Sequence, residues 1–178
     1  MAVLDVGCGT GIILACLAGK KLKMTGIDIQ EDLIELAKEN VPEAEFILGD
    51  IAKIKLDKTF DLVITNPPYF RESAPSAARK LARHETVTLK EWLSFCMRRI
   101  KPKGRLTCIL PAERLDEALS VLREKLGNIK ILPVFSKKTD QTAHAVILEG
   151  TLNAKGKTEL KAPIYTDSKE IKDKLRGK

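Results

Sequence analysis

Short apolar segments alternate with amphipathic ones along most of this 178-residue chain. The apolar segments are four to six residues long, the length of strands buried on both faces of a sheet, whereas the segments between them repeat apolar residues at helical spacing. Strand–helix–strand units of this kind build a mostly parallel sheet covered by helices. The predicted strands are residues 2–6, 24–29, 45–48, 61–65 and 105–110, and the predicted helices are residues 12–18, 31–41, 89–100 and 115–126. Because residues 12–18 are apolar on every side, we expect that helix to be buried.

The last two predicted strands, residues 129–135 and 143–148, are separated by only about seven polar residues. A parallel crossover needs a dozen or more residues, so these strands are predicted to run antiparallel. We therefore expect an α/β fold with a doubly wound, mostly parallel, Rossmann-like sheet of seven strands that ends in an antiparallel hairpin. Residues 1–150 form this domain, and residues 151–178 are expected to be a basic extension that packs on it.

The composition excludes several classes of protein. Hydrophobic residues make up 44% and charged residues 31% of the chain, which is typical of soluble globular proteins. No apolar run approaches the roughly 18 residues of a membrane span, and the N-terminus lacks the basic region of a secretory signal. The four cysteines, Cys8, Cys16, Cys96 and Cys108, show no Cys-x-x-Cys spacing. We therefore expect a cytoplasmic protein with reduced thiols, no membrane segment and no metal.

Charge is distributed unevenly between the two halves of the chain. Residues 1–89 carry 11 Lys and Arg and 13 Asp and Glu, whereas residues 90–178 carry 20 and 11. A basic second half favours a polyanionic partner, with nucleic acid as the natural candidate. The alternative is a solvated, lysine-rich surface without a polyanionic ligand.

The residues of unusual chemistry all follow predicted strands, where ligands bind in open α/β sheets. Residues 7–11 read Gly-Cys-Gly-Thr-Gly, a turn that lets backbone N–H groups approach a ligand closely. Its last glycine comes one position earlier than in the dinucleotide fingerprint. Asp28 is suited to accept both hydroxyls of a ribose, and Asp50 to accept from an exocyclic amine. Alternatively, Asp28 is a helix N-cap and Asp50 a surface turn residue. Together these positions predict a site for a nucleoside with a charged tail.

Asn66, Pro67, Pro68 and Tyr69 follow the fourth predicted strand. Two consecutive prolines cannot continue a strand, and they hold the backbone near a fixed φ. A primary amide and an aromatic ring are thereby presented together at the mouth of the predicted site.

These motifs resemble the motif series of class I S-adenosylmethionine-dependent methyltransferases. The resemblance rests on residues 3–11, 26–28, 49–50 and 61–69. It implies that S-adenosyl-L-methionine is the cofactor, with the backbone of Gly7, Gly9 and Gly11 at its methionine part. Asp28 would hold its ribose, and Asp50 its adenine amine. Asp5 would brace the glycine loop or meet the cofactor amino group. The resemblance also assigns Cys8, Ile29 and Ile51 to the cofactor site, together with Asn66. The catalytic residues it implies are Asn66, Pro67, Pro68 and Tyr69.

The chain is further similar to the bacterial group that methylates adenine N6 in tRNA beside the valine anticodon. Residues 82–85, 102–104, 114–115, 143–150 and 164–166 carry this finer resemblance. It implies RNA, and specifically tRNA, as the partner. The sequence leaves the oligomeric state open between a monomer and a weak dimer. The basic stretch 71–105 would bind that RNA. The expected RNA contacts are Arg71, Arg79, Lys80, Arg83 and His84; His84 as a general base is the less favoured interpretation.

Three alternatives remain open from the sequence. The Asn-Pro-Pro-Tyr motif also serves enzymes that methylate a glutamine amide of release factors, or adenine in DNA. A catalytically inactive RNA-binding remnant is the third alternative. Members of the resembled tRNA group usually continue ahead of the first strand with a segment that helps cover the cofactor. The resemblance therefore implies an incomplete cofactor pocket, and weak cofactor binding, in these 178 residues.

Overall fold

A computed structural model describes residues 1–68, 87–168 and 171 of the chain. The strands are β1 Ala2–Val6, β2 Lys23–Asp28, β3 Glu45–Leu48, β4 Phe60–Thr65, β5 Ile100–Pro111, β6 Leu126–Phe135, β7 Ala145–Leu152, β8 Glu159–Leu160 and β9 Ile164–Tyr165. The helices are α1 Ile12–Ala15, α2 Glu31–Asn40, α4 Leu89–Arg98 and α5 Leu115–Leu122, with a 3₁₀ turn η1 at Ala112–Arg114.

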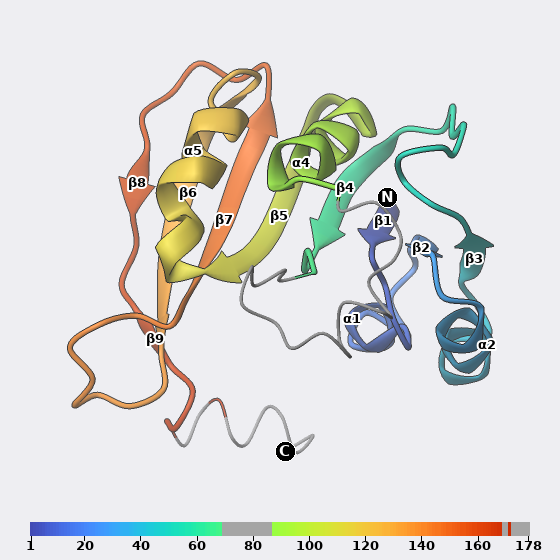
Figure 1. Ribbon diagram of the computed structural model, residues 1–178, viewed down its shortest axis with the longest axis horizontal. Helices are drawn as coiled ribbons and strands as arrows, with labels where there is room; N and C mark the ends of the chain where they lie inside the picture. Colours follow the sequence, from blue (N-terminus) through green and yellow to red (C-terminus); the bar gives the residue numbers. More distant parts are fainter. Residues whose placement is uncertain (69–86, 169–170, 172–178) are drawn as a thin grey trace.

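The strands form one sheet in the order β3-β2-β1-β4-β5-β7-β6-β8, with β9 also paired to β6 (Figure 1). The pairs from β3 to β5 are all parallel, while β7 runs antiparallel to both β5 and β6. The expected α/β fold with its antiparallel last hairpin is therefore confirmed. The expected number of seven strands was too low, because β8 and β9 join the sheet beside β6. Strands of two residues are too short to produce a periodic pattern in the sequence.

Successive side chains of β1 point to opposite faces of the sheet and belong to two different hydrophobic cores, one on each face. Leu4 and Val6 belong to the larger core, which also contains the buried residues of α4 and α5. Val3 belongs to the smaller core, together with Leu14 of α1 and Val41 at the end of α2. Helices thus cover both faces, as a doubly wound sheet requires. None of the helices in the described ranges is long and apolar enough to cross a bilayer.

Several predicted boundaries were wrong. The helix expected at 12–18 ends at Ala15, after which the chain makes tight turns from Leu17 N–H to the Leu14 carbonyl and from Ala18 N–H to the Ala15 carbonyl. Its first residue, Ile12, is 66% exposed, because a helix of four residues on one face of the sheet cannot bury every side. The strand expected at 105–110 begins five residues earlier, at Ile100, as the long strand β5. The helix α5 ends four residues before the predicted residue 126, which instead begins β6.

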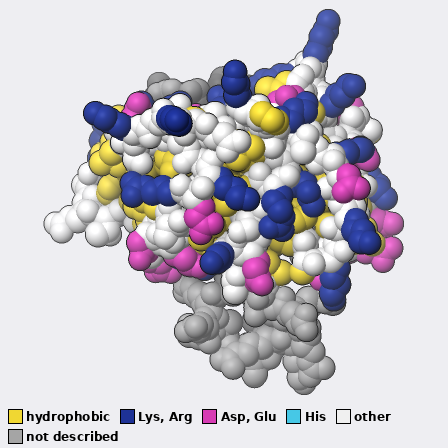
Figure 2. Space-filling view, turned by 90° about the horizontal axis from the view of Figure 1, so that it is seen from above, with side chains coloured by type: hydrophobic (Ala, Val, Ile, Leu, Met, Phe, Trp, Pro, Cys, Tyr) yellow, Lys and Arg dark blue, Asp and Glu magenta, His cyan; other side chains and the backbone are white. Residues whose placement is uncertain are grey.

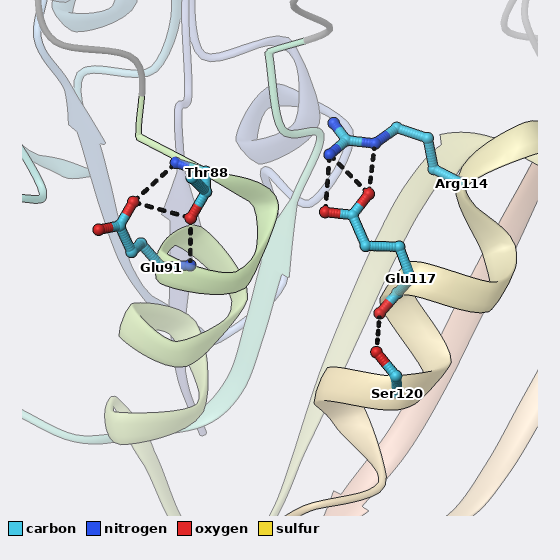
Figure 3. A network of polar contacts seen from close by, with 5 residues as sticks. All are labelled: Thr88, Glu91, Arg114, Glu117 and Ser120. Atoms are coloured by element: carbon cyan, nitrogen blue, oxygen red, sulfur yellow. Dashed lines mark hydrogen bonds and ion pairs between the residues drawn. The ribbon is translucent and has the colours of Figure 1, made fainter.

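A capping box sets the start of α4 (Figure 3). The hydroxyl of Thr88 accepts from the N–H of Glu91 at 3.2 Å, and the Glu91 carboxylate accepts from the N–H of Thr88 at 2.8 Å. Two otherwise unpaired N–H groups of the first turn are satisfied in this way. Since the helix begins at Leu89, its first turn includes Trp92 and its buried side contains Leu93 and Cys96.

Residues beyond β7 pack against the beginning of β6. β7 runs to Leu152, two residues past the expected boundary at 150, and Asn153 N–H then donates to the Lys125 carbonyl at 2.9 Å. A Cβ added to Gly127 would lie 2.1 Å from the Ala154 carbonyl oxygen. Only glycine fits there, because the atom it meets belongs to the backbone and cannot rotate away.

We expect Gly127→Ala to lower the free energy of unfolding by about 2–3 kcal/mol, since the added methyl must displace backbone atoms. Urea denaturation followed by circular dichroism measures this loss. Gly150→Ala on the neighbouring strand is the comparison, because its Cβ would lie 3.0 Å from Leu126 Cδ1 and 3.1 Å from Leu126 Cβ, a milder overlap than the 2.1 Å at Gly127. Equal losses in the two variants would contradict the packing of residue 154 on β6.

Candidate active site

The glycine loop after β1 is held against the end of β2. The N–H groups of Gly7 and Cys8 both donate to the Ile27 carbonyl, at 2.8 and 2.9 Å. Gly7, Gly9 and Gly11 all have positive φ, between 52° and 78°, a conformation that side chains strongly disfavour. A Cβ at Gly9 would have no atom within 4 Å. The loop therefore exposes backbone at Gly9 that a ligand can approach closely.

Asp28, the last residue of β2, supports this loop with its side chain. One carboxylate oxygen accepts from the N–H of Gly9 at 2.8 Å and the other from the N–H of Gln30 at 3.0 Å. The N-cap of α2 is Gln30, so the alternative that Asp28 caps this helix is wrong. Each Asp28 oxygen retains acceptor capacity beyond these two bonds.

Asp5 is a fully buried carboxylate within β1. Among the described residues, no donor lies within hydrogen-bond distance of either of its oxygens. Burial, with a further contribution from Asp28, raises the pKa of Asp5 to about 7. Burial also raises the pKa of the Cys8 thiol to about 12, and Asp5 and Asp28 add to that shift. Two buried acids under a glycine loop favour a positively charged ligand group, which would lower the cost of ionising Asp5.

Asp50 and Ile51 follow β3, whose end is joined to β2 by the bond from Gly49 N–H to the Asp28 carbonyl at 2.8 Å. The Asp50 carboxylate accepts from the N–H of Ala52 at 2.9 Å and lies 3.6 Å from the Lys53 ammonium. It thus closes a turn, as the alternative interpretation expected, and it keeps further acceptor capacity.

Apolar side chains surround the acids at this edge of the sheet. Ile29 is 40% exposed, directly after Asp28, and Leu48 is 48% exposed at the end of β3. Ile51 packs on the larger hydrophobic core. An apolar surface beside acceptor groups suits a flat heterocycle that carries amine and hydroxyl donors.

Asn66, Pro67 and Pro68 follow β4, at the same edge as the glycine loop. Asn66 and Pro68 are exposed and Pro67 is buried. The Asn66 carbonyl oxygen lies 4.0 Å from the position that a Cβ of Gly7 would occupy. The proline motif and the glycine loop are therefore neighbours. The predicted catalytic residue Tyr69 and the predicted RNA contacts Arg71, Arg79, Lys80, Arg83 and His84 lie outside the described residues.

Trp92 and Thr65 support the glycine loop through side-chain hydrogen bonds. The sequence did not predict this role. The Trp92 indole N–H donates to the Thr65 hydroxyl at 2.8 Å, and that hydroxyl donates to the Val6 carbonyl at 2.7 Å. A Cβ at Gly7 would lie 2.9 Å from the indole ring. Trp92 is the one tryptophan of the chain. Its helical spacing indicated only a core residue, since no periodic pattern reports a bond to another strand.

Of the basic stretch expected at 71–105, the described residues are those from 87 on, and they lie mainly in α4 and β5. α4 begins at Leu89 and carries the chain away from the proline motif, and β5 then begins beside Phe60, at the amino end of β4. Residues 98–105 therefore lie at the opposite end of the sheet from Asn66.

A family model described as a methyltransferase domain matches residues 1–162. The chain belongs to this family. With the sheet order and glycine loop described above, it is a class I S-adenosylmethionine-dependent methyltransferase domain, and S-adenosyl-L-methionine is its cofactor. Within residues 1–68, 87–168 and 171, no three His, Cys, Asp or Glu side chains are arranged to hold a metal ion.

Similar curated proteins include two named tRNA1(Val) (adenine(37)-N6)-methyltransferase. The protein from Parabacteroides distasonis is 32% identical over 135 residues, which are 69% of this chain and 57% of that protein. The protein from Porphyromonas gingivalis is 32% identical over 152 residues, 73% of this chain and 60% of that protein. The chain thus spans somewhat more than half the length of these relatives.

Solved structures show the same fold at lower identity. A predicted O-methyltransferase from Agrobacterium tumefaciens has a TM-score of 0.79 and 15% identity, covering 99% of this chain and 88% of that chain. An N-methyltransferase from Bradyrhizobium japonicum, in complex with S-adenosyl-L-homocysteine, has a TM-score of 0.64 and 14% identity, covering 86% and 78%.

The buried Asp5 makes stability depend on pH. Its pKa is about 7 in the folded protein and near the ordinary 3.8 when unfolded, so between these values the folded state binds more protons. The free energy of unfolding of the cofactor-free protein should therefore fall as the pH rises from about 4 to 7, by at most about 1.4 kcal/mol per pH unit. Asp5→Asn should remove this dependence and be the more stable protein at pH 8.

Urea denaturation of wild type and Asp5→Asn across this pH range measures the difference. Asp57→Asn, at an exposed position before β4, is the control for removal of one carboxylate. If the free energy of unfolding of wild type and of Asp5→Asn changes with pH in the same way, Asp5 is ionised equally in the folded and the unfolded protein, and the prediction is wrong.

Proposed function

We propose that this chain transfers a methyl group from S-adenosylmethionine to the N6 amine of adenine in tRNA. The observation that carries the proposal is the position of Asn66-Pro67-Pro68 directly beside the glycine loop at the carboxyl edge of the sheet. The names of the curated relatives support tRNA adenine as the substrate, and the basic second half of the chain agrees with a polyanionic one.

The residues at this edge fit the cofactor. Asp5 is a buried carboxylate without a donor in the described part of the chain, and it suits the cofactor's ammonium group. Asp28 can accept the ribose hydroxyls with its remaining lone pairs, and Asp50 the adenine amine. Ile29 and Ile51 offer apolar surface to the adenine ring. When bound, the cofactor supplies a methyl group activated by attachment to a positively charged sulfur.

The chain's own task is to prepare the adenine amine. The lone pair of this nitrogen is conjugated with the ring, so it is a poor nucleophile. The Asn66 side-chain oxygen and the Pro67 carbonyl can accept its two N–H groups, which favours a pyramidal nitrogen with its lone pair directed away from both. Pro67 is buried and the paired prolines restrict the backbone, so these acceptors are held ready. Correct positioning of this kind can contribute roughly 7–11 kcal/mol to catalysis.

The target base has to leave its stack to reach Asn66, at a cost of a few kcal/mol. Stacking on Tyr69 would return roughly 1–3 kcal/mol. No general base is required, since the nitrogen can lose its proton to water after the methyl group has been transferred.

Methylation of a glutamine amide in a protein would use the same acceptors. The experiment that separates the substrates is transfer of tritiated methyl from the cofactor, with total tRNA and a glutamine-containing peptide assayed side by side. We expect N6-methyladenosine in the nuclease digest of the tRNA. Label on peptide glutamine and none on tRNA would overturn the proposal.

Asn66→Ala should lower the single-turnover rate about 10²–10³-fold, by analogy with the loss of one preorganised polar contact. Cofactor affinity should stay within a few-fold, as measured by calorimetry. Asn40→Ala is the matched control: Asn40 is exposed and donates to the Thr10 carbonyl at 3.0 Å, so it touches the same loop from another side. An Asn66→Ala protein that keeps more than half the wild-type rate would refute the assignment.

A further inference from the structure

Basic residues gather at the end of the sheet opposite the candidate site. We define the amino-end surface as the segments where β2, β3, β4, β5 and β6 begin and where the antiparallel β7 ends. These segments are residues 18–23, 42–45, 54–61, 98–105, 123–126 and 152–158. They contain fourteen Lys and Arg and five Asp and Glu, a net charge of +9, whereas the whole chain carries +7. The remainder of the chain is therefore slightly acidic.

The pairing of the strands makes these segments one continuous row. Ala2 of β1 pairs with Lys23, and its N–H donates to the Asp61 carboxylate at 2.6 Å. Phe60 pairs with Ile100. β7 lies between β5 and β6, and its end pairs with the first half of β5 and the start of β6. Thr151 lies opposite Arg105, and Leu152 lies opposite Leu126. Figure 2, which views the molecule from above relative to Figure 1, shows Lys and Arg side chains spread over this side.

Few of these cations are neutralised locally. Asp61 pairs with Lys101 at 3.0 Å, Glu45 with Lys58 at 2.8 Å, and Glu149 with Arg105 at 3.7 Å. By contrast Arg98, Lys103 and Lys125 are exposed and form no ion pair within the described part of the chain. Their charge is directed at solvent, where it can attract a polyanion.

The helix α4 connects this surface with the site. Lys90, Ser94 and Arg98 are four residues apart, so they lie along one side of the helix. All three retain solvent exposure. The acid of the first turn, Glu91, is engaged in the capping box with Thr88. The ten residues of α4 span about 15 Å, so Lys90 and Arg98 place one positive charge near each end of the helix.

We propose that the amino-end surface binds the phosphate backbone of the RNA substrate, at a distance from the base that enters the site, with the backbone following α4. This inference rests on the proposed function. The lack of apolar anchors favours RNA over an acidic protein: among the large hydrophobic side chains that are exposed in the described residues, only Met1 lies at this end. Protein interfaces need an apolar centre, whereas phosphate contacts do not.

The test compares two triple variants that each remove three positive charges. Arg98→Gln, Lys103→Gln and Lys125→Gln together change the amino-end surface. The control combines Lys38→Gln on α2 with Lys137→Gln and Lys138→Gln after β6, three exposed cations that form no ion pair within the described part of the chain. Fluorescence anisotropy with labelled tRNA gives the dissociation constant over a series of salt concentrations. We expect the first triple to weaken binding at least about tenfold and to reduce the log–log salt slope by roughly 2–3, and the control to change neither by half as much.

Single-turnover methyl transfer at saturating tRNA should be equal in wild type and both triples, because the chemistry occurs at the other end of the sheet. Equal tRNA affinities of the two triples would overturn the inference while leaving the proposed function intact. So would competition by poly-L-glutamate as strong as competition by unlabelled RNA, since the surface would then serve an acidic protein. Failure of the wild-type chain to bind or methylate tRNA would instead contradict the proposed function, and this inference with it.

Discussion

Three backbone N–H groups attach the glycine loop to the end of β2, and the rest of the candidate site depends on that attachment. Gly7 and Cys8 donate to the Ile27 carbonyl, and Gly9 donates to the Asp28 carboxylate. These bonds hold the loop in a positive-φ conformation that is open at Gly9. On the other side, the bonds from Trp92 through Thr65 to Val6 connect β1, β4 and α4. The loop therefore has little freedom before a cofactor arrives, which reduces the entropy lost on binding.

The two ends of the sheet differ in charge. The carboxyl edge has two buried acids, Asp5 and Asp28, which suit a cationic cofactor. The amino-end surface has a net charge of +9, which suits phosphate. A cationic cofactor and the proposed polyanionic substrate need fields of opposite sign, and a separation by the length of α4 would keep each field from cancelling the other. Asp5 is the sensitive point of this arrangement, because a carboxylate without a donor in the described part of the chain is costly to ionise.

Most of the fold could be predicted from local pattern. The strand cores and the antiparallel last pair were predicted correctly because buried strands and amphipathic helices have different apolar periods, and because seven residues cannot form a parallel crossover. The helix at residue 12 was predicted too long, and β8 and β9 were not predicted. These elements are too short to show a periodic pattern. In addition, β8 and β9 are strands because they pair with β6, and a local propensity does not report that pairing.

The candidate site, like the fold, could be predicted from the sequence only in part. The sequence by itself determined which groups follow each strand: the glycines after β1, Asp28, Asp50, and Asn66 with its prolines. Strand ends can be recognised locally, and a parallel sheet must bring them to one edge. Only the tertiary structure decided that Asp28 holds Gly9, that Asp5 is buried without a donor in the described residues, and that Trp92 lies under Gly7. It also decided that residues 98–105 lie at the far end of the sheet, because contacts between distant segments depend on strand order and crossover direction, which no sequence window contains.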